Sequence, residues 1–335
     1  MTVPQATYQV IYNGKNVTGD ILRYVKNLVY SDKSKGEADE LDIVMEDSEK
    51  IWQTAWYPVK GDTISAKIIY QGNTLDCGTF TVDEITGDGS TDGDTFTIKA
   101  IAAGINKSIR TKQSYAHENK TLREIVNTIA TKNGFTVVGT INNVSIGRET
   151  QHKETDLHFL KRLAKNYGYT FSIRGTQLIF TDIFSIENKQ QALTIDRSQI
   201  SSYSINDKTS NTFKAAKISY HNPKQNAVIN YDVNESNASY QTAKNDTLIL
   251  HGRVENKQQA EIITKVALYR ANSLQQSGTI EMDGNVLVLA GNNCILQGLG
   301  MFSGNYYIDS TTHSVDPDGG YSTSAEIKRV GLITT

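Results

Sequence analysis

The sequence predicts a mainly β protein with an α+β insert, in which two similar small β-barrels flank the inserted segment. Three observations favour this fold class. Short segments that alternate apolar and polar residues, separated by turn residues, fill both ends of the chain. Helical periodicity replaces this alternation near residue 120 and returns near residue 256. A short motif near residue 80 recurs near residue 305, as expected for a duplicated unit.

Residues 1–110 are predicted to form the first β-barrel domain. A strand at 8–12 runs into Asn13-Gly14, a pair typical of tight hairpin turns. Many short strands with regularly spaced turns indicate a small barrel or sandwich. Further strands are expected at 41–45, 63–70, 79–83 and 95–100, with turns or loops at 71–73 and 87–94.

Residues 111–185 are predicted to form a small α+β insert domain. Thr121 and Glu124 have the spacing of a capping box, and the apolar residues after them recur at helical spacing. A second helix is expected at 156–167, ended by a glycine. The basic segment 106–113 is interpreted as a solvated linker that leads into the insert, with a place at a subunit contact as the alternative.

Residues 186–335 are predicted to form the second β-barrel domain, with a long helix at about 256–276. Asn256, followed three residues later by Gln259, is typical of a helix start. The polar stretch 234–246 is expected to be a long exposed loop.

The internal repeat has the pattern Gly-x-aromatic-x-aliphatic-Asp. It occurs at 78–83 and at 304–309, and each copy is followed by a turn with Asp-Gly. An Ile-Lys pair then follows, at 98–99 in the first copy and 327–328 in the second. The likeness indicates two copies of one barrel, and a chance similarity between two hairpins is the alternative.

The composition argues against several classes of function. A net charge of −2 and a pI near 6.3 provide no basic surface for specific nucleic acid binding. No apolar run reaches the ~18 residues of a membrane span, and the start of the chain lacks the pattern of a secretory signal. Cys77 and Cys294 are too few for a disulfide framework and are expected to be free thiols.

No motif for catalysis, cofactor binding or a metal centre stands out. The six histidines have no metal-ligand spacing, and each is expected to be a surface or structural residue; His313 is expected to end a strand beside a turn. Asp88, Asp92 and Asp94 resemble the start of a calcium loop, but Lys99 stands where that loop needs a glutamate. Glycosidases need only two carboxylates placed anywhere in the chain, so the sequence leaves a lysozyme-like site open.

The C-terminal region carries a family resemblance. Its motifs, together with segments 121–126 and 154–168 of the insert, resemble the phage late-control D family of tail hub proteins, which are akin to the hub half of type VI secretion spike proteins. The likeness runs from about residue 8 to residue 330 and is weakest in the N-terminal barrel. The C-terminal motifs are Gly-Leu-Gly at 298–300, Gly-Asn-Tyr-Tyr-Ile at 304–308, His-Ser-Val at 313–315, Gly-Gly-Tyr-Ser-Thr at 319–323 and Lys-Arg at 328–329.

The resemblance implies a structural hub without enzymatic activity, cofactor or metal. Such hubs form a homotrimeric ring, and two barrels in each subunit make the ring pseudo-hexameric. The ring would join a hexameric tail tube protein to a trimeric central spike protein, with the tape-measure protein as a further partner and no membrane contact. The protein is then expected in the virion tail or baseplate of a phage or contractile injection system, assembled in the cytoplasm of the bacterial host.

Four apolar residues on the two long hairpins are candidate assembly contacts, because an uncovered strand edge invites pairing with another chain. They are Phe80, Val82, Tyr306 and Ile308.

Two other classes of function are kept as alternatives. Each helix–turn–strand piece of the insert also resembles a LysM-type peptidoglycan-binding module, which would make the chain a cell-wall module or a hydrolase. A carbohydrate-binding β-module would need exposed aromatic platforms, for which Trp52 and Trp56 are the candidates. Negative-stain images discriminate between these classes, since a ring with a central hole fits only the hub.

Overall fold

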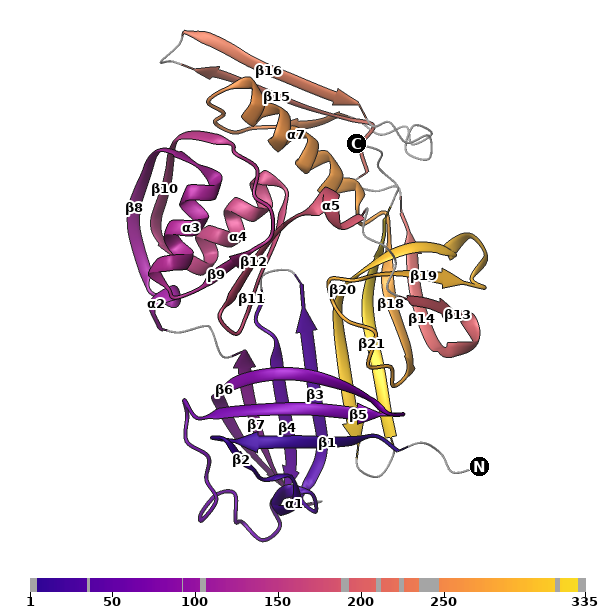
Figure 1. Ribbon diagram of the computed structural model, residues 1–335. Coiled ribbons are helices and arrows are strands. Elements are labelled where there is room, and N and C mark those ends of the chain that lie inside the picture. Colours follow the sequence, from indigo (N-terminus) through magenta and orange to yellow (C-terminus); the bar gives the residue numbers. More distant parts are fainter. Residues whose placement is uncertain are drawn as a thin grey trace.

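Over the residues that it describes, the computed structural model contains four sheets and a few helices (Figure 1). The largest sheet has 13 strands and takes them from both ends of the chain. The prediction of a mainly β fold with an α+β insert is confirmed. The structure describes residues 5–34, 37–91, 93–102, 107–187, 193–208, 212–222, 226–234, 247–316 and 320–330.

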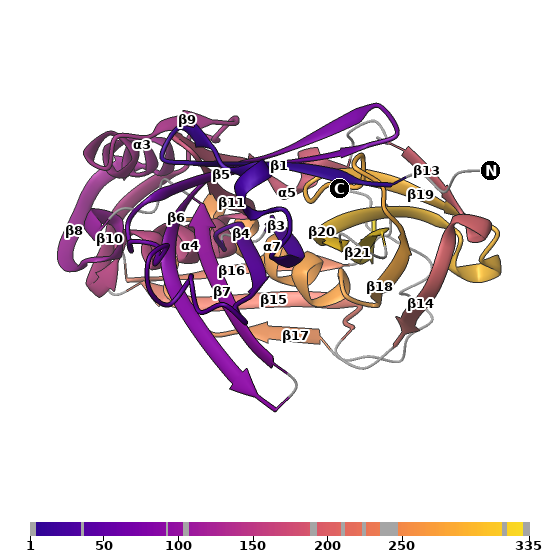
Figure 2. The same cartoon turned by 90° about the horizontal axis from the view of Figure 1, so that it is seen from below.

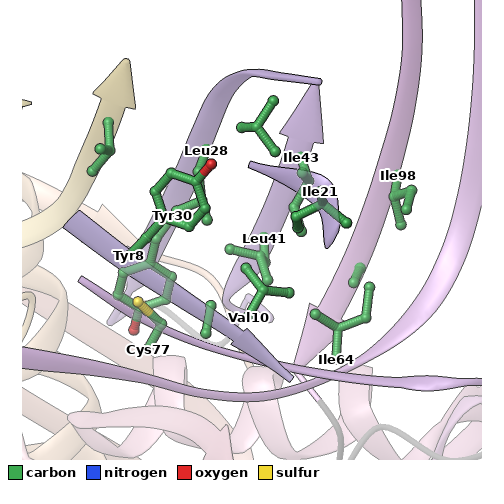
Figure 3. Close-up of a cluster of buried hydrophobic side chains, with 14 of the residues drawn as sticks. Tyr8, Val10, Ile21, Leu28, Tyr30, Leu41, Ile43, Ile64, Cys77 and Ile98 are labelled. Atoms are coloured by element: carbon green, nitrogen blue, oxygen red, sulfur yellow. The ribbon is translucent and has the colours of Figure 1, made fainter. Parts of the chain in front are cut away.

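The N-terminal part of the chain forms a barrel-like half of the large sheet. Its elements are β1 (Thr7–Tyr12), β2 (Lys15–Asn16), α1 (Thr18–Ile21), β3 (Val25–Lys33), β4 (Glu40–Glu46), β5 (Thr63–Tyr70), β6 (Asn73–Ser90) and β7 (Gly93–Ala102). Neighbouring strands follow the order β3-β4-β7-β6-β5-β1-β2. Alternate side chains point into one core, where Leu28, Leu41 and Ile64 are buried (Figure 3). The turn predicted at Asn13-Gly14 has positive φ at both residues, as a tight hairpin requires.

The insert folds around two helices. Its elements are α2 (Lys107–Arg110), β8 (Lys112–Thr121), α3 (Leu122–Lys132), β9 (Thr136–Val138), β10 (Ser145–Thr155), α4 (Asp156–Tyr167), β11 (Tyr169–Arg174), β12 (Gln177–Asp182) and α5 (Ile183–Glu187). The predicted capping box is present, because the Thr121 hydroxyl accepts from the Glu124 N–H and the Glu124 carboxylate accepts from the Thr121 N–H. The helix α4 ends at Gly168, which has the left-handed φ of 79°.

The C-terminal part of the chain supplies the second barrel-like half. Its elements are β13 (Leu193–Asp196), η1 (Arg197–Gln199), β14 (Ile200–Asp207), β18 (Gln276–Asp283), β19 (Asn293–Gln297), η2 (Gly300–Phe302), β20 (Gly304–Asp316) and β21 (Gly320–Arg329). Leu296, Tyr306 and Ile308 lie at the centre of its core, and none of them is exposed.

A separate small sheet lies between β14 and β18 in the sequence. It has the order β16-β15-β17 and is formed by β15 (Ala215–Asn222), β16 (Ala227–Asn234) and β17 (Thr247–Leu250). The long helix α7 (Lys257–Asn272) packs on it through Ala260, and its first turn is capped by the Asn256 side chain, as predicted. Residues 186–335 therefore hold this sheet in addition to the barrel strands. The loop expected at 234–246 lies outside the described residues beyond Asn234.

Three local expectations were wrong. The loop expected at 87–94 is largely strand, because β6 and β7 keep pairing as far as Ser90 opposite Gly93; Asp92 lies outside the described residues. The supposed linker at 106–113 is part of the insert, since it forms α2 and the start of β8 and buries Ile109; residue 106 is not among the described residues. His313 lies within β20 and is fully buried, and does not end a strand.

Candidate assembly surface

One sheet, antiparallel from β14 to β6, runs through both barrel halves of the chain. β20 pairs with β21 along one edge, and its second half pairs with β3 along the other, from Ser310 opposite Lys33 to Val315 opposite Leu28. The strands β14-β18-β21-β20-β3-β4-β7-β6 are therefore consecutive neighbours. Figure 1 shows β20 and β21 reaching from their own barrel to the strands of the first.

The two halves have the same strand order. It is β1-β5-β6-β7-β4-β3 in the first half and β13-β19-β20-β21-β18-β14 in the second. The edge strands differ in one respect, since β1 is antiparallel to β5 whereas β13 is parallel to β19. An irregularity also coincides: the pairing of β6 with β7 shifts between Val82 and Glu84, and that of β20 with β21 shifts between Ile308 and Ser310.

A second bulge fixes the correspondence at the other side of each half. The pairing of β3 with β4 shifts between Val25 and Asn27, and that of β14 with β18 shifts between Ile200 and Ser202. Bulges are specific features of a strand pair, so two coincident bulges relate the halves residue by residue.

This correspondence changes the register of the repeat read from the sequence. Lys99 lies opposite Glu84 in the first half, and Glu326 lies opposite Ser310 in the second. In the structure, Lys99 therefore corresponds to Glu326. The Ile-Lys motif of the sequence instead aligns Lys99 with Lys328, two residues later.

A buried histidine stands at the joint between the halves. The His313 ring stacks on Tyr30 of β3, with centroids 6.0 Å apart and planes at 17°. Its Nδ1 lies 2.7 Å from the Tyr321 hydroxyl and its Nε2 lies 3.1 Å from the Val288 carbonyl oxygen. Burial lowers the pKa of the imidazole to about 4, so the ring is neutral near pH 7. Sequence reasoning gave His313 a structural or surface role, and the structural one applies.

Two buried carboxylates share one half-exposed arginine, which ties the insert to both halves. Asp32 of β3 accepts from Arg174 at the end of β11 over 2.5 Å and from the Ala290 N–H over 3.0 Å. Asp39 lies 3.8 Å from the same guanidinium. Burial, followed by the charge of Asp32, raises the pKa of Asp39 to about 6. Sequence reasoning did not foresee this cluster, because its members are far apart in the chain.

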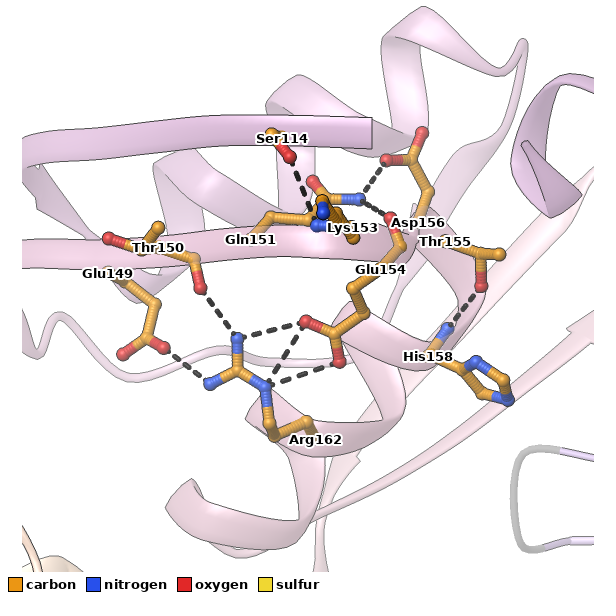
Figure 4. Close-up of polar contacts among 10 residues, drawn as sticks. All are labelled: Ser114, Glu149, Thr150, Gln151, Lys153, Glu154, Thr155, Asp156, His158 and Arg162. Carbon is orange, nitrogen blue, oxygen red and sulfur yellow. Dashed lines mark hydrogen bonds and ion pairs between the residues drawn. The ribbon is translucent and has the colours of Figure 1, made fainter. Parts of the chain in front are cut away.

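The insert has its own polar network, which is satisfied internally (Figure 4). Arg162 of α4 forms ion pairs with Glu149 at 2.6 Å and Glu154 at 3.1 Å, and it donates to the Thr150 carbonyl. The buried Asp156 carboxylate accepts from Gln151 over 2.9 Å. The charged groups of Arg162, Glu149, Glu154 and Asp156 each have a partner, and these contacts hold α4 against β10.

The four candidate assembly residues are buried inside one chain. Phe80 and Val82 belong to the core of the first half, and Tyr306 and Ile308 to that of the second. Any role that they have in assembly must therefore be exerted through the strands that they anchor. That role stays a prediction.

The described residues include two thiols and one apolar cavity. They contain no cluster of three or more His, Cys, Asp or Glu side chains that could hold a metal ion. None of the helices in the described ranges combines the length and the apolar character of a bilayer span. Cys77 and Cys294 are free and buried. An apolar cavity of about 390 Å³ opens at one end of the first half, where Trp52 is buried and Trp56 is 44% exposed.

Sequence comparison gives a family match over most of the chain. The sequence model of the phage tail baseplate hub (GPD) family matches residues 82–319. The probable baseplate hub proteins of Escherichia phages P2 and 186 are 30% and 29% identical over 176 residues, which is 52% of this chain and 44% of each relative. The matched region is thus less than half the length of these curated relatives.

Solved structures share the fold at low sequence identity. The 43 kDa tail protein of prophage MuSo2 from Shewanella oneidensis superposes with a TM-score of 0.73 at 17% identity, over 98% of this chain and 100% of that one. The tail protein from Neisseria meningitidis MC58 gives 0.71 at 14% identity, over 98% of each chain. A component of the Escherichia coli type VI secretion system gives 0.60 at 14% identity, over 93% of this chain and 75% of that one.

Proposed function

The chain belongs to the phage tail baseplate hub (GPD) family, and on that premise we propose that it is the structural hub of a phage tail baseplate or related contractile injection machine. The hub would form a ring that joins a hexameric tail tube protein to a trimeric central spike protein. The tape-measure protein is a further proposed partner. The protein would act in the virion tail after assembly in the cytoplasm of the bacterial host.

The observation that supports this proposal most directly is the coincidence of strand order and bulges in the two halves of one chain. Three copies of a chain with two equivalent halves would present six similar units to the tail tube and three identical chains to the central spike. A homotrimer of this kind resolves the mismatch between a six-fold tube and a three-fold spike. The division of the chain at residues 110 and 185 belongs to this proposal, with the insert outside the ring-forming halves.

We propose further that the protein is not an enzyme. The family is one of structural hubs, and the charged groups of the insert network are engaged with one another. Purified peptidoglycan should therefore be left intact by the protein. Turnover that a single carboxylate substitution abolishes would contradict this part of the proposal.

The experiment that tests the hub role combines imaging, mass and partner binding. Purified protein is weighed by mass photometry, imaged in negative stain, and mixed with tail tube protein. We expect three-copy rings with a central hole that bind the tube end. A strict monomer that sediments with peptidoglycan and does not bind tail tube protein would instead favour the LysM-like alternative.

A further inference from the structure

The joint between the two halves of one chain is a template for a contact between chains. In this joint, the second half of β20 pairs with β3 in the register Ser310–Lys33 through Val315–Leu28. The first half of β20 does not take part, because β19 covers it from Gly304 to Tyr307. In the joint, β20 is thus longer than its neighbour β19. The part of its edge that β19 leaves unpaired is paired with β3 of the other barrel half.

The first half of the chain contains the same arrangement with its edge uncovered. β6 corresponds to β20, and β5 covers it only as far as Thr81. The strand continues to Ser90 in partnership with β7 alone. Among the described residues, no strand pairs with the other edge of β6 between residues 84 and 89. The strand therefore has a free edge where β20 has β3.

The complementary edge also exists, at the far end of the same sheet. β14 corresponds to β3 and is paired on one side by β18, whereas in the described parts of the chain its other side has no neighbour. Figure 2 shows the tip of the β6–β7 hairpin at the bottom of the view and β14 at the right, apart from each other. One chain cannot join its own two edges in this arrangement, but one copy can join the next.

Side chains of β3 are buried in the template joint, whereas corresponding side chains of β14 are exposed. This is the difference expected if β14 lacks its partner strand in the single chain. Leu28, Tyr30 and Asp32 of β3 are all buried in the joint. Of their counterparts in β14, Tyr203 and Asp207 are exposed and Ile205 is half-buried. Tyr203 leaves 43% of its surface uncovered, although its counterpart Leu28 leaves none.

A loop beside the joint shows the same contrast. Within one chain, the loop after β18 covers the joint, and its Val286 is buried in the core of the first half. The corresponding loop after β4 carries three large apolar side chains with exposed fractions of 44%, 53% and 62%: Trp56, Tyr57 and Val59. A second copy placed by the template would cover this loop.

We propose that residues 84–89 of β6 pair antiparallel with residues 203–208 of β14 from a second copy of the chain. The template fixes the register, because the coincident bulges equate Glu84 with Ser310 and Ser202 with Asn27. Glu84 then lies opposite Lys208 of the second copy, Thr86 opposite its Asn206, and Asp88 opposite its Ser204. This assignment rests on the proposed ring and names the contact that closes it.

The chemistry of the two edges fits this register. Glu84 and Lys208 have opposite charges on the same face of the joined sheet, and both are exposed in the free chain. On the other face, Gly87 and Gly89 lie opposite Ile205 and Tyr203. No heavy atom lies within 4 Å of a Cβ placed on Gly87, so there is room for Ile205 of the second copy; at Gly89 a Cβ would lie 2.8 Å from the Asp94 carboxylate, a side chain that would have to move for Tyr203.

Paired cysteines test both the contact and its register. Directly opposed residues have Cβ atoms ~5 Å apart and diagonal ones ~7 Å, and a disulfide needs the shorter separation. The matched variants are Thr86→Cys with Asn206→Cys, and Asp88→Cys with Ser204→Cys. The shifted controls exchange the partners, so that Thr86→Cys is combined with Ser204→Cys and Asp88→Cys with Asn206→Cys. The native thiols are buried, so they contribute little background.

The template provides a positive control within one chain. Thr312→Cys with Ser31→Cys occupies the same relative position as Thr86 with Asn206, and its disulfide links two parts of a single copy. Non-reducing electrophoresis after mild oxidation separates the products, and circular dichroism checks that each variant is folded. We expect covalent trimers from both matched pairs, none from the shifted pairs, and an internal disulfide in the control.

Two results would overturn the assignment. One is an internal disulfide in the control without inter-chain products from either matched pair, and the other is shifted pairs that cross-link as well as matched ones. If rings form but the matched pairs stay reduced, this contact is wrong and the hub role stands. If the matched pairs give trimers that do not bind tube protein, the contact stands and the hub role fails.

Discussion

Acid should weaken the joint between the two halves through one histidine. His313 is fully buried against Tyr30 and Tyr321, and burial lowers its pKa to about 4 from the ordinary 6.5. The unfolded chain therefore binds a proton at this residue at a higher pH than the folded chain does. The stability that depends on neutral His313 is present in full above about pH 6.5 and is lost as the pH falls towards 4. Both tyrosines have pKa values raised by burial and stay neutral in this range.

The size of the effect follows from the pKa difference. A shift of roughly 2.5 units corresponds to about 3 kcal/mol once both forms are fully protonated. Between pH 7 and pH 5, the same linkage predicts a loss of about 2 kcal/mol. Asp39 acts in the opposite direction, because its pKa is raised to about 6 and the fold favours its neutral form below that pH. Replacing His313 leaves Asp39 in place, so its contribution cancels when the two proteins are compared.

The assay is urea unfolding of the native protein and of His313→Gln at pH 7 and pH 5. Glutamine can still donate a hydrogen bond to the Val288 carbonyl, and it does not titrate. We expect the native protein to lose about 2 kcal/mol more than the variant over this interval. His158→Gln, at an exposed position of α4, should keep the native pH dependence. Equal pH dependence in the native protein and in His313→Gln would refute the reasoning.

Proline in a strand interior should prevent assembly. Thr81→Pro or Tyr307→Pro places a residue without an N–H between two paired strands at a cost of about 3 kcal/mol or more, and we expect no rings in negative stain and no tails. Lys161→Ala should leave rings intact, because its ion pair is exposed; the reverse pattern would contradict barrel-driven assembly. Arg174→Ala should cost about 2 kcal/mol in thermal unfolding, because it leaves Asp32 buried without its cation, and an unchanged melting temperature would count against the cluster. Arg174→Lys should recover part of this loss.

Local features of the fold could be predicted from the sequence. The capping box at Thr121, the glycine end of the helix 156–167 and the tight turn at Asn13-Gly14 are each specified by a few neighbouring residues. Such signals depend on hydrogen bonds and backbone angles within one turn, so tertiary context rarely overrides them. Family-level motifs in the C-terminal strands then supplied the functional class.

Long-range pairings could not be predicted in the same way. The joint of β20 with β3 connects residues almost three hundred positions apart in the sequence, and neither strand contains a motif from which its partner strand can be identified. The sequences of the corresponding strands β3 and β14 share only a short motif, Asp-Lys at 32–33 and again at 207–208. The bulges after Val82 and Ile308 stand at corresponding places in the two halves. With them aligned, the Ile-Lys pair of the second copy lies two residues further along its strand than that of the first, so an alignment by this motif alone misplaces the strand.

The joint within one chain and the proposed contact between chains would form at different stages, and this accounts for the difference between their strands. β3 and β20 meet as the chain folds, so they can bury residues such as Leu28, Tyr30 and Val315 without exposing them in a free subunit. In the proposed ring, the edges of β6 and β14 would face water until a second copy binds, and an apolar edge strand in that position would pair with unrelated strands. Accordingly, β14 is mostly polar, and the outer end of β6 is rich in glycine and acidic residues. On the proposed contact, one strand arrangement thus serves twice, with an apolar version inside the chain and a polar version between chains, so that folding precedes ring closure.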